Sequence, residues 1–109
     1  MIFRVWHGWT TPENAAPYQE HLRSVVLAEL QELDGFRGMS VLRREDGDLF
    51  AFQVQTRWDS LESIRAFAGD DLETAVVPPE AQAVLARFDE HVTHFDEVLG
   101  AGGGDPHER

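Results

Sequence analysis

The chain has 109 residues, of which 42% are hydrophobic and 27% are charged, a composition typical of one folded domain and not of a disordered polypeptide. Twenty acidic and nine basic residues give a net charge of -11, so electrostatic repulsion argues against binding to nucleic acid or to an anionic membrane. The absence of cysteine excludes disulfides, thiolate metal sites and a cysteine nucleophile.

The first residues do not have the character of a targeting segment. They already contain Arg4 and His7, and they end at the turn-forming sequence Thr10-Thr11-Pro12. The unbroken apolar runs are a few residues long, against the roughly 20 that a membrane-spanning helix needs. We therefore expect a soluble, cytoplasmic protein.

Residues 2–9 are rich in β-branched and aromatic side chains and predict a first strand. A helix is predicted to follow, with Thr11 as its N-cap and Pro12 at its first position. Its apolar stripe recurs at three- and four-residue spacing and consists of Tyr18, Leu22, Val25, Val26, Leu30 and Leu33. Because Pro17 interrupts the pattern, a regular helix that begins only at Pro17 is the alternative.

Asp34-Gly35 is predicted to end this helix, and residues 36–44 and 49–58 predict two strands joined by a hairpin at Asp46-Gly47. Asp59-Ser60 predicts the cap of a short helix that ends at Gly69.

The last third of the chain is less regular. A turn of helix is predicted within residues 72–77, a helix over residues 80–88, and a fourth strand over residues 90–99.

The order β-α-β-β-α-β predicts an α+β fold of the ferredoxin-like type. It has one four-stranded antiparallel sheet, with the first strand in its interior and the helices on a single face. We expect one domain over residues 1–99, followed by a flexible tail over residues 100–109, which is rich in glycine and has nothing to bury.

Alternation divides the first strand into two faces that both carry large apolar side chains. We expect Phe3, Val5 and His7 to face the helices, and Arg4 to lie with Arg57 on the uncovered face. Trp6 and Phe95 on that face would form an exposed apolar patch. The sequence therefore predicts a homodimer that buries this patch, with a half-exposed monomer as the alternative.

Several segments resemble the antibiotic biosynthesis monooxygenase family: residues 4–8 (RVWHG), 38–44 (GMSVLRR), 58–69 (WDSLESIRAFAG) and 92–95 (VTHF). The resemblance implies a dimeric α+β barrel with a cavity between sheet and helices in each protomer. The activities that it implies are oxygenation of quinols and anthrones without a cofactor, and haem degradation. The haem-degrading branch uses an Asn, a Trp and a His where this chain has His7, Phe67 and Val77. The resemblance therefore does not extend to haem degradation.

Oxygenation without a cofactor requires a base, aromatic walls and a donor for the developing oxyanion. His7 is the predicted base, and His94 is a second catalytic candidate if it shares a face with His7. For both, the alternative is a histidine with a purely structural role. The candidates for substrate binding, for which core packing is the alternative, are Tyr18, Trp58, Phe67, Phe3 and Val5. No metal site is predicted, because His91 and His94 point to opposite faces of a strand.

The leading hypothesis is a homodimeric monooxygenase that oxidises a small aromatic or quinol-like compound with molecular oxygen and uses no cofactor. One alternative is a non-catalytic dimer that binds an apolar metabolite in the same cavity. Another is a cofactor-free isomerase of the same barrel type. The chain has no Gly-x-Ser-x-Gly motif, so a hydrolase of that class is not indicated.

Overall fold

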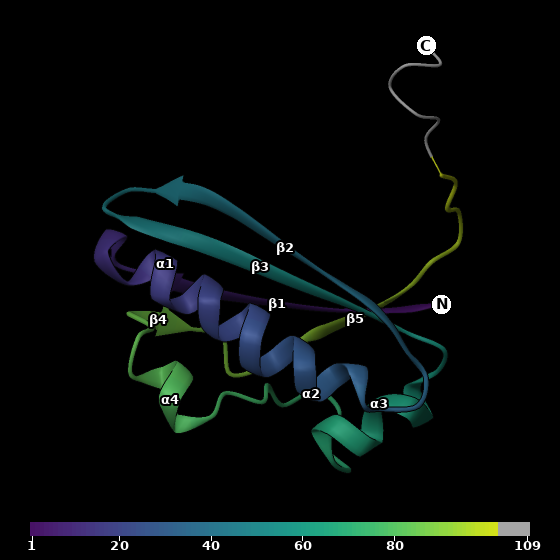
Figure 1. The fold of residues 1–109 in the computed structure, drawn as a ribbon. Helices are drawn as coiled ribbons and strands as arrows, with labels where there is room; N and C mark the ends of the chain where they lie inside the picture. Colours follow the sequence, from purple (N-terminus) through teal and green to yellow (C-terminus); the bar gives the residue numbers. More distant parts are fainter. Residues whose placement is uncertain (103–109) are drawn as a thin grey trace.

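The computed structural model describes residues 1–102 and contains one antiparallel sheet with its helices on one face (Figure 1). The strands, in spatial order, are β2 (Phe36–Asp46), β3 (Leu49–Trp58), β1 (Ile2–Thr10) and, both paired with β1, the short β4 (Arg87–Phe88) and β5 (Thr93–Asp96). This arrangement confirms the α+β, ferredoxin-like fold and the interior position of the first strand. The hairpin is also confirmed, because Asp46 pairs with Leu49 across a two-residue turn.

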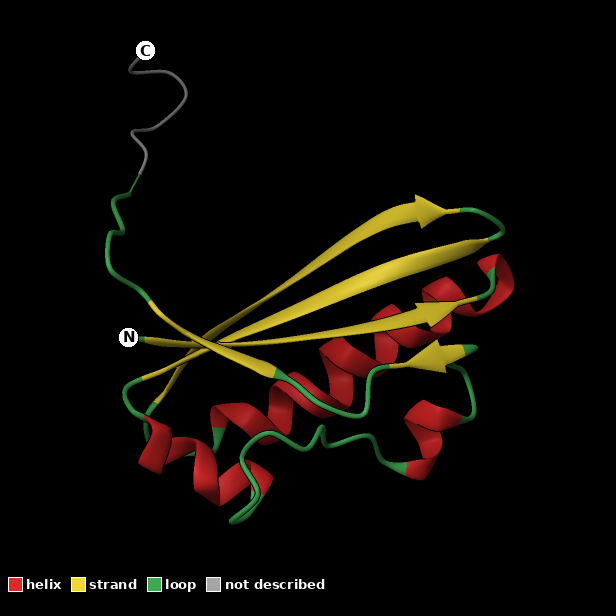
Figure 2. Cartoon of the chain, turned by 180° about the vertical axis from the view of Figure 1, so that it is seen from behind, coloured by secondary structure: helices red, strands yellow, loops and turns green. Residues whose placement is uncertain are grey.

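The predicted fourth strand is divided into β4 and β5, which Figure 2 shows as two separate arrows. Between them the chain leaves β1 and pairs with residues 73–75. Val92 donates its backbone N–H to Glu73, and Ala75 donates to Glu90. Residues 72 and 73 form a single turn, in which Thr74 donates to the carbonyl of Asp71, but residues 74–77 are not helical, so the helical turn predicted within residues 72–77 is wrong. The helix predicted over residues 80–88 is limited to α4 (Pro79–Gln82).

The first helical segment is continuous and has three parts, α1 (Pro12–His21), the π-helical η1 (Leu22–Val26) and α2 (Leu27–Gln31). It begins at Pro12 with Pro17 inside α1, so a start at Pro17 is excluded. In η1 the N–H of Leu27 donates to the carbonyl of Leu22, five residues back. The buried stripe is consequently narrower than predicted, and Val25 is 38% exposed.

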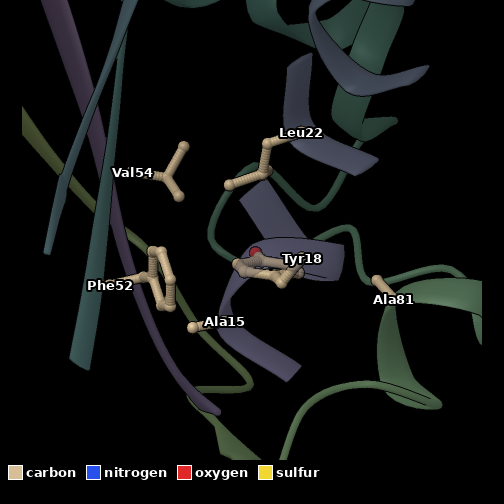
Figure 3. Close-up of a cluster of buried hydrophobic side chains, with 6 residues drawn as sticks. All are labelled: Ala15, Tyr18, Leu22, Phe52, Val54 and Ala81. Atoms are coloured by element: carbon tan, nitrogen blue, oxygen red, sulfur yellow. The ribbon is translucent and has the colours of Figure 1, made fainter. Parts of the chain in front are cut away.

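The core consists of two clusters between the helices and the sheet. In the first, Tyr18 of α1 lies between the side chain of Phe52 on β3 and that of Ala81 on α4 (Figure 3). The rings of Tyr18 and Phe52 meet edge to face at 5.1 Å. The second cluster is built around Trp58 and includes Ile64 of α3 (Leu61–Ala68). These contacts fix the first helical segment along β3 and β1.

The first helical segment ends at Gln31, with Glu32 as its C-cap, four residues before the predicted stop, and Gly35 lies in the turn that leads into β2, where its backbone has a φ of 86°. A Cβ atom added there would lie 2.4 Å from the Cβ of Ser63. Gly35→Ala is therefore expected to cost about 2–4 kcal/mol of unfolding free energy, from left-handed strain plus overpacking. Gly47→Ala is the control, because Gly47 has a φ of 61° but open space around it, and it should cost about 1 kcal/mol. Urea denaturation measures both values, and equal losses would contradict the steric argument.

No helix within residues 1–102 combines the length and the apolar character that spanning a membrane requires. The cytoplasmic location stays a prediction. The predicted boundary at residue 99 also stays a prediction, and most of the predicted tail, residues 103–109, lies outside the described residues.

Candidate active site

The even-numbered side chains of β1, and not the odd-numbered ones, face the helices. Arg4 pairs with Thr56 and Trp6 with Val54, and Thr56 and Val54 belong to the face of β3 that the helices cover. The prediction that Phe3, Val5 and His7 face the helices is therefore wrong. These three side chains lie on the opposite surface of the sheet, which we call the open face and which consists of Phe3, Val5, His7, Leu42, Gln53, Gln55 and Phe95.

His7 and His94 lie on opposite faces of the sheet, so the two imidazoles do not act on one site. His94 pairs with Arg4 on the helix side, where its Nε2 lies 3.1 Å from Nη1 of Arg4. On the open face, Gln53 donates to Nε2 of His7 at 2.9 Å, and Nδ1 of His7 lies 3.6 Å from a carboxylate oxygen of Asp89.

A largely apolar cavity of about 70 Å³ lies between the sheet and the helices. We call it the helix-side cavity. Its polar lining consists of Arg4, Tyr18, His21 and Thr56, and its apolar lining includes Trp6, Leu22, Val54, Phe67, Val76, Val77 and Val92. The ring of Trp6 lies across Gly8, where a Cβ atom would come within 2.5 Å of it, and its Nε1 donates to the carbonyl of Asp89 at 2.7 Å. These two contacts fix the ring of Trp6 against Gly8, where it forms one wall of the cavity.

The side chain of Arg4 brings a buried positive charge to this cavity, because Arg4 is only 4% exposed. Nη1 donates to the carbonyl of Leu72 and to Nε2 of His94, and Nη2 donates to the carbonyl of Thr74 at 3.0 Å. The guanidinium carbon lies 5.9 Å from the centre of the Phe67 ring. No Asp or Glu within residues 1–102 forms an ion pair with Arg4. Burial lowers the pKa of Arg4 to about 10.

His21, the last residue of α1, brings an unpaired imidazole nitrogen to the same cavity. Its ring stacks on that of Tyr18 at 6.3 Å, and both rings line the cavity. Nε2 of His21 is buried and has no hydrogen-bond partner in the described part of the chain. Burial also raises the pKa of the Tyr18 hydroxyl, so that group stays protonated. An unpaired buried nitrogen is rare in folded proteins, and a catalytic role is one of the explanations for such a group.

The predicted substrate-binding residues on the helix side divide into two groups. Tyr18 and Phe67 line the cavity. Trp58 does not: it is fully buried behind Phe67, with the rings 6.2 Å apart, and donates to Oγ1 of Thr56 at 2.9 Å. Trp58 is therefore a core residue that supports Phe67.

Sequence reasoning missed His21 and placed Arg4 on the wrong face. A signal was present for both residues. His21 follows Tyr18 by three residues and so flanks the apolar stripe, and Arg4 is the strand partner of Thr56, two residues from Trp58.

The contact between His94 and Arg4 predicts a pH dependence of stability. Burial, and then the charge of Arg4, lower the pKa of His94 from 6.5 in the folded protein. The unfolded chain therefore binds the proton more readily, so this contribution to stability is complete above about pH 6.5 and is lost as the pH falls through the folded pKa. The melting temperature should fall between about pH 7.5 and pH 5.5 by more in the natural chain than in His94→Gln, which keeps an acceptor for Arg4. Parallel curves would contradict this assignment.

Solved structures with the same fold include three relevant comparisons. The haem degrader MhuD from Mycobacterium tuberculosis, with two haems in its active site, is 23% identical and has a TM-score of 0.59, covering 94% of this chain and 100% of that chain. The monooxygenase ActVA-Orf6 from Streptomyces coelicolor, in complex with nanaomycin D, is 15% identical with a TM-score of 0.59, over 94% and 92%. A candidate antibiotic biosynthesis monooxygenase from Bacillus cereus is 12% identical with a TM-score of 0.64, over 96% and 98%. At these identities the similarity shows the fold alone. No curated protein matches the chain.

The helix-side cavity does not fit a haem. Val77, at the position where the resemblance expects the haem-binding His, lines the cavity with an apolar side chain. The cavity volume of about 70 Å³ is also far smaller than a haem macrocycle. In the part of the chain that the structure describes, no three His, Asp or Glu side chains come together as a metal-binding group.

The sequence match agrees with the fold. Residues 1–76 match the pattern of the family described as antibiotic biosynthesis monooxygenase, and this range covers β1, the first helical segment, the β2–β3 hairpin and α3. It includes Arg4, Trp6, Tyr18, His21 and Phe67 of the cavity. Because the match spans more than half of the chain and agrees with its topology, the protein belongs to the antibiotic biosynthesis monooxygenase family.

Proposed function

We propose that this protein is a cofactor-independent monooxygenase that oxidises a small aromatic compound in the helix-side cavity. Membership of the family supports monooxygenase-type activity. The single observation that carries the proposal is the buried, unpaired Nε2 of His21 beside a wall of aromatic side chains. A base without a competing partner, in a site that excludes water, is what this chemistry requires of the protein.

In the proposed reaction, Nε2 of His21 takes the proton of a phenolic hydroxyl. The phenolate transfers one electron to O₂, and the resulting aryl radical and superoxide combine to form a C–O bond. Protonation gives a ring hydroperoxide, which loses water and leaves a quinone. One oxygen atom enters the ring and the other leaves as water, with all four electrons supplied by the substrate. Trp6 and Phe67 would shield the radical pair from solvent.

The size of the cavity limits the substrate. A volume of about 70 Å³ is tight even for a one-ring quinol and excludes a polycyclic compound unless the lining moves. A larger ring system requires the wall that contains Val76 and Val77 to move outward. This wall is a segment without regular secondary structure between α3 and α4.

A substrate panel tests the proposal. One-ring hydroquinones, naphthols and anthrones are incubated with the protein in air and under nitrogen, and oxygen consumption and quinone formation are recorded. Entry of one atom of ¹⁸O from labelled O₂ into the quinone, without release of hydrogen peroxide, supports the proposal, whereas an unlabelled quinone formed together with hydrogen peroxide would contradict it. Turnover under nitrogen would instead favour the isomerase alternative, and binding without turnover would favour the non-catalytic binding protein. A haemin titration without a Soret shift is expected, because the cavity does not fit the macrocycle.

We also propose that the protein is a homodimer through its open face. Phe95 is 54% exposed and Leu42 51% exposed on this face, and no helix within residues 1–102 covers it (Figure 2). A row of hydrogen-bonded polar groups crosses its centre, in which Gln55 donates to Gln53, and Gln53 donates to His7. An apolar patch with a self-contained polar row suits a two-fold interface, because each copy leaves few polar groups unpaired.

A further inference from the structure

We propose that the helix-side cavity takes its substrate as an anion, an aromatic ring that carries a carboxylate, and that the guanidinium of Arg4 binds this carboxylate. The inference rests on the proposed function only for the location of the site. It is carried by the burial of Arg4, by the absence of an ion pair between Arg4 and any carboxylate of residues 1–102, and by its unused donors.

Arg4 differs from the ion-paired arginines of this chain. Arg23, Arg37 and Arg65 lie at the surface and pair with acidic side chains, at distances of 2.6 to 3.3 Å. Arg4 is 4% exposed and, within the described residues, contacts only neutral groups. A buried charge without a counter-ion costs several kcal/mol, so proteins rarely keep one unless something binds to it. Although the chain is rich in acidic residues, none of those within residues 1–102 forms an ion pair with Arg4.

The hydrogen bonds of Arg4 leave room for a two-point contact. A guanidinium has five N–H donors. Leu72, His94 and Thr74 accept from three of them, so two donors remain, one of them on Nε. The remaining donors are therefore one on Nε and one on Nη2, the two nitrogens with which arginine binds both oxygens of a carboxylate. The three existing contacts hold the guanidinium in place, so ligand binding costs little additional conformational entropy of this side chain.

The surroundings of Arg4 favour an aromatic ring attached to that carboxylate. Phe67 lies under the guanidinium, and Trp6 forms the next wall along the same strand. Tyr18 lies farther along, because it packs on Phe52, which is the strand partner of Gly8, and His21 stacks on Tyr18. Gly8 is four residues, or about 13 Å, from Arg4 along β1. A ring held between these two ends would present a carboxylate to Arg4 and a hydroxyl toward His21, as in a hydroxylated aromatic acid.

A matched pair of ligands tests this inference on the natural chain. Para-hydroxybenzoate and para-hydroxybenzamide have the same ring and nearly the same size, and differ in charge. Isothermal titration at about pH 7.5, where the acid is ionised, should show the acid binding about 10–100-fold more tightly than the amide. In an NMR titration, the Nε–H signal of Arg4 should shift with the acid and not with the amide. Equal affinities, or no binding of either ligand, would overturn the inference.

Two variants add a control. Arg4→Gln should remove the preference for the acid, and Arg57→Gln should leave it unchanged, because Arg57 lies on the other face of the sheet, 5.8 Å from the Phe3 ring. If Arg4→Gln does not fold, the ligand pair and the Nε–H shift still decide the question. The result is also separable from the proposed monooxygenase. Selective binding of the acid without oxygen uptake refutes the oxygenase alone, and oxygen uptake with neutral phenols and no preference for acids refutes the anion site alone.

Discussion

Replacing His21 by Gln is expected to lower substrate-dependent oxygen uptake by about 10²–10⁴-fold, the usual contribution of a general base. Glutamine fills a similar volume and keeps a polar atom at the cavity wall, but it cannot accept the phenolic proton. The fold should survive, because Nε2 of His21 has no hydrogen-bond partner to lose in the described chain. The rate is measured with whichever phenol the substrate panel identifies, and urea denaturation checks that stability is retained.

His7→Gln is the matched control for this prediction. His7 lies on the open face, with its Nε2 bonded to Gln53, and has no access to the helix-side cavity. Its replacement should therefore change the rate by less than about threefold. If His7→Gln abolishes oxygen uptake and His21→Gln does not, the base assigned from the strand pattern is right and the cavity assigned from the structure is not the active site.

The parts of the fold that were predictable depend on residues close together in the sequence. Ser60 caps α3 by accepting from the backbone N–H of Ser63, and Gly69 ends that helix. The turn after Asp46 and the turn before β2 likewise contain glycines with positive φ, Gly47 and Gly35. Local chemistry of this kind gives both the type and the limits of an element.

The last third of the chain was mispredicted because its backbone partners are distant in sequence. Residues 72–77 have enough apolar side chains for a helical turn, but Glu73 and Ala75 bond to residues 90–92. The same contact draws residues 90–92 away from β1 and divides the fourth strand. No local pattern reports such a pairing, and it decides the conformation of both segments.

The position of the site could not be predicted from the sequence, because both faces of β1 carry apolar side chains. Phe3 and Val5 on one face are as apolar as Ile2 and Trp6 on the other, so alternation shows which residues share a face and not which face is covered. The presence of Arg4 led to the prediction that its face of β1 is uncovered, because arginine is almost never fully buried. Its burial is the exception to that rule, and exceptions of this kind concentrate at functional sites.

Replacing Phe95 by Glu is expected to convert the proposed dimer to a monomer, with the dissociation constant raised by about 10²–10⁴-fold. A two-fold interface receives the substitution twice, so two unpaired carboxylates would have to be buried close to each other. The protomer should remain folded, because Phe95 is 54% exposed in it and contributes little to its own core. Sedimentation velocity over a range of concentrations measures the change.

The control for this prediction separates the interface from the overall charge. The chain already carries a net charge of -11, and any added carboxylate increases the general repulsion between copies. Val25→Glu adds the same charge at a side chain that is 38% exposed in η1, in the helical layer on the other side of the sheet. If only Phe95→Glu dissociates, the open face is the interface. If the natural chain sediments as a monomer at every concentration, the open face is solvent-exposed and the dimer proposal fails, while the helix-side cavity, which one protomer builds alone, stands independently of that result.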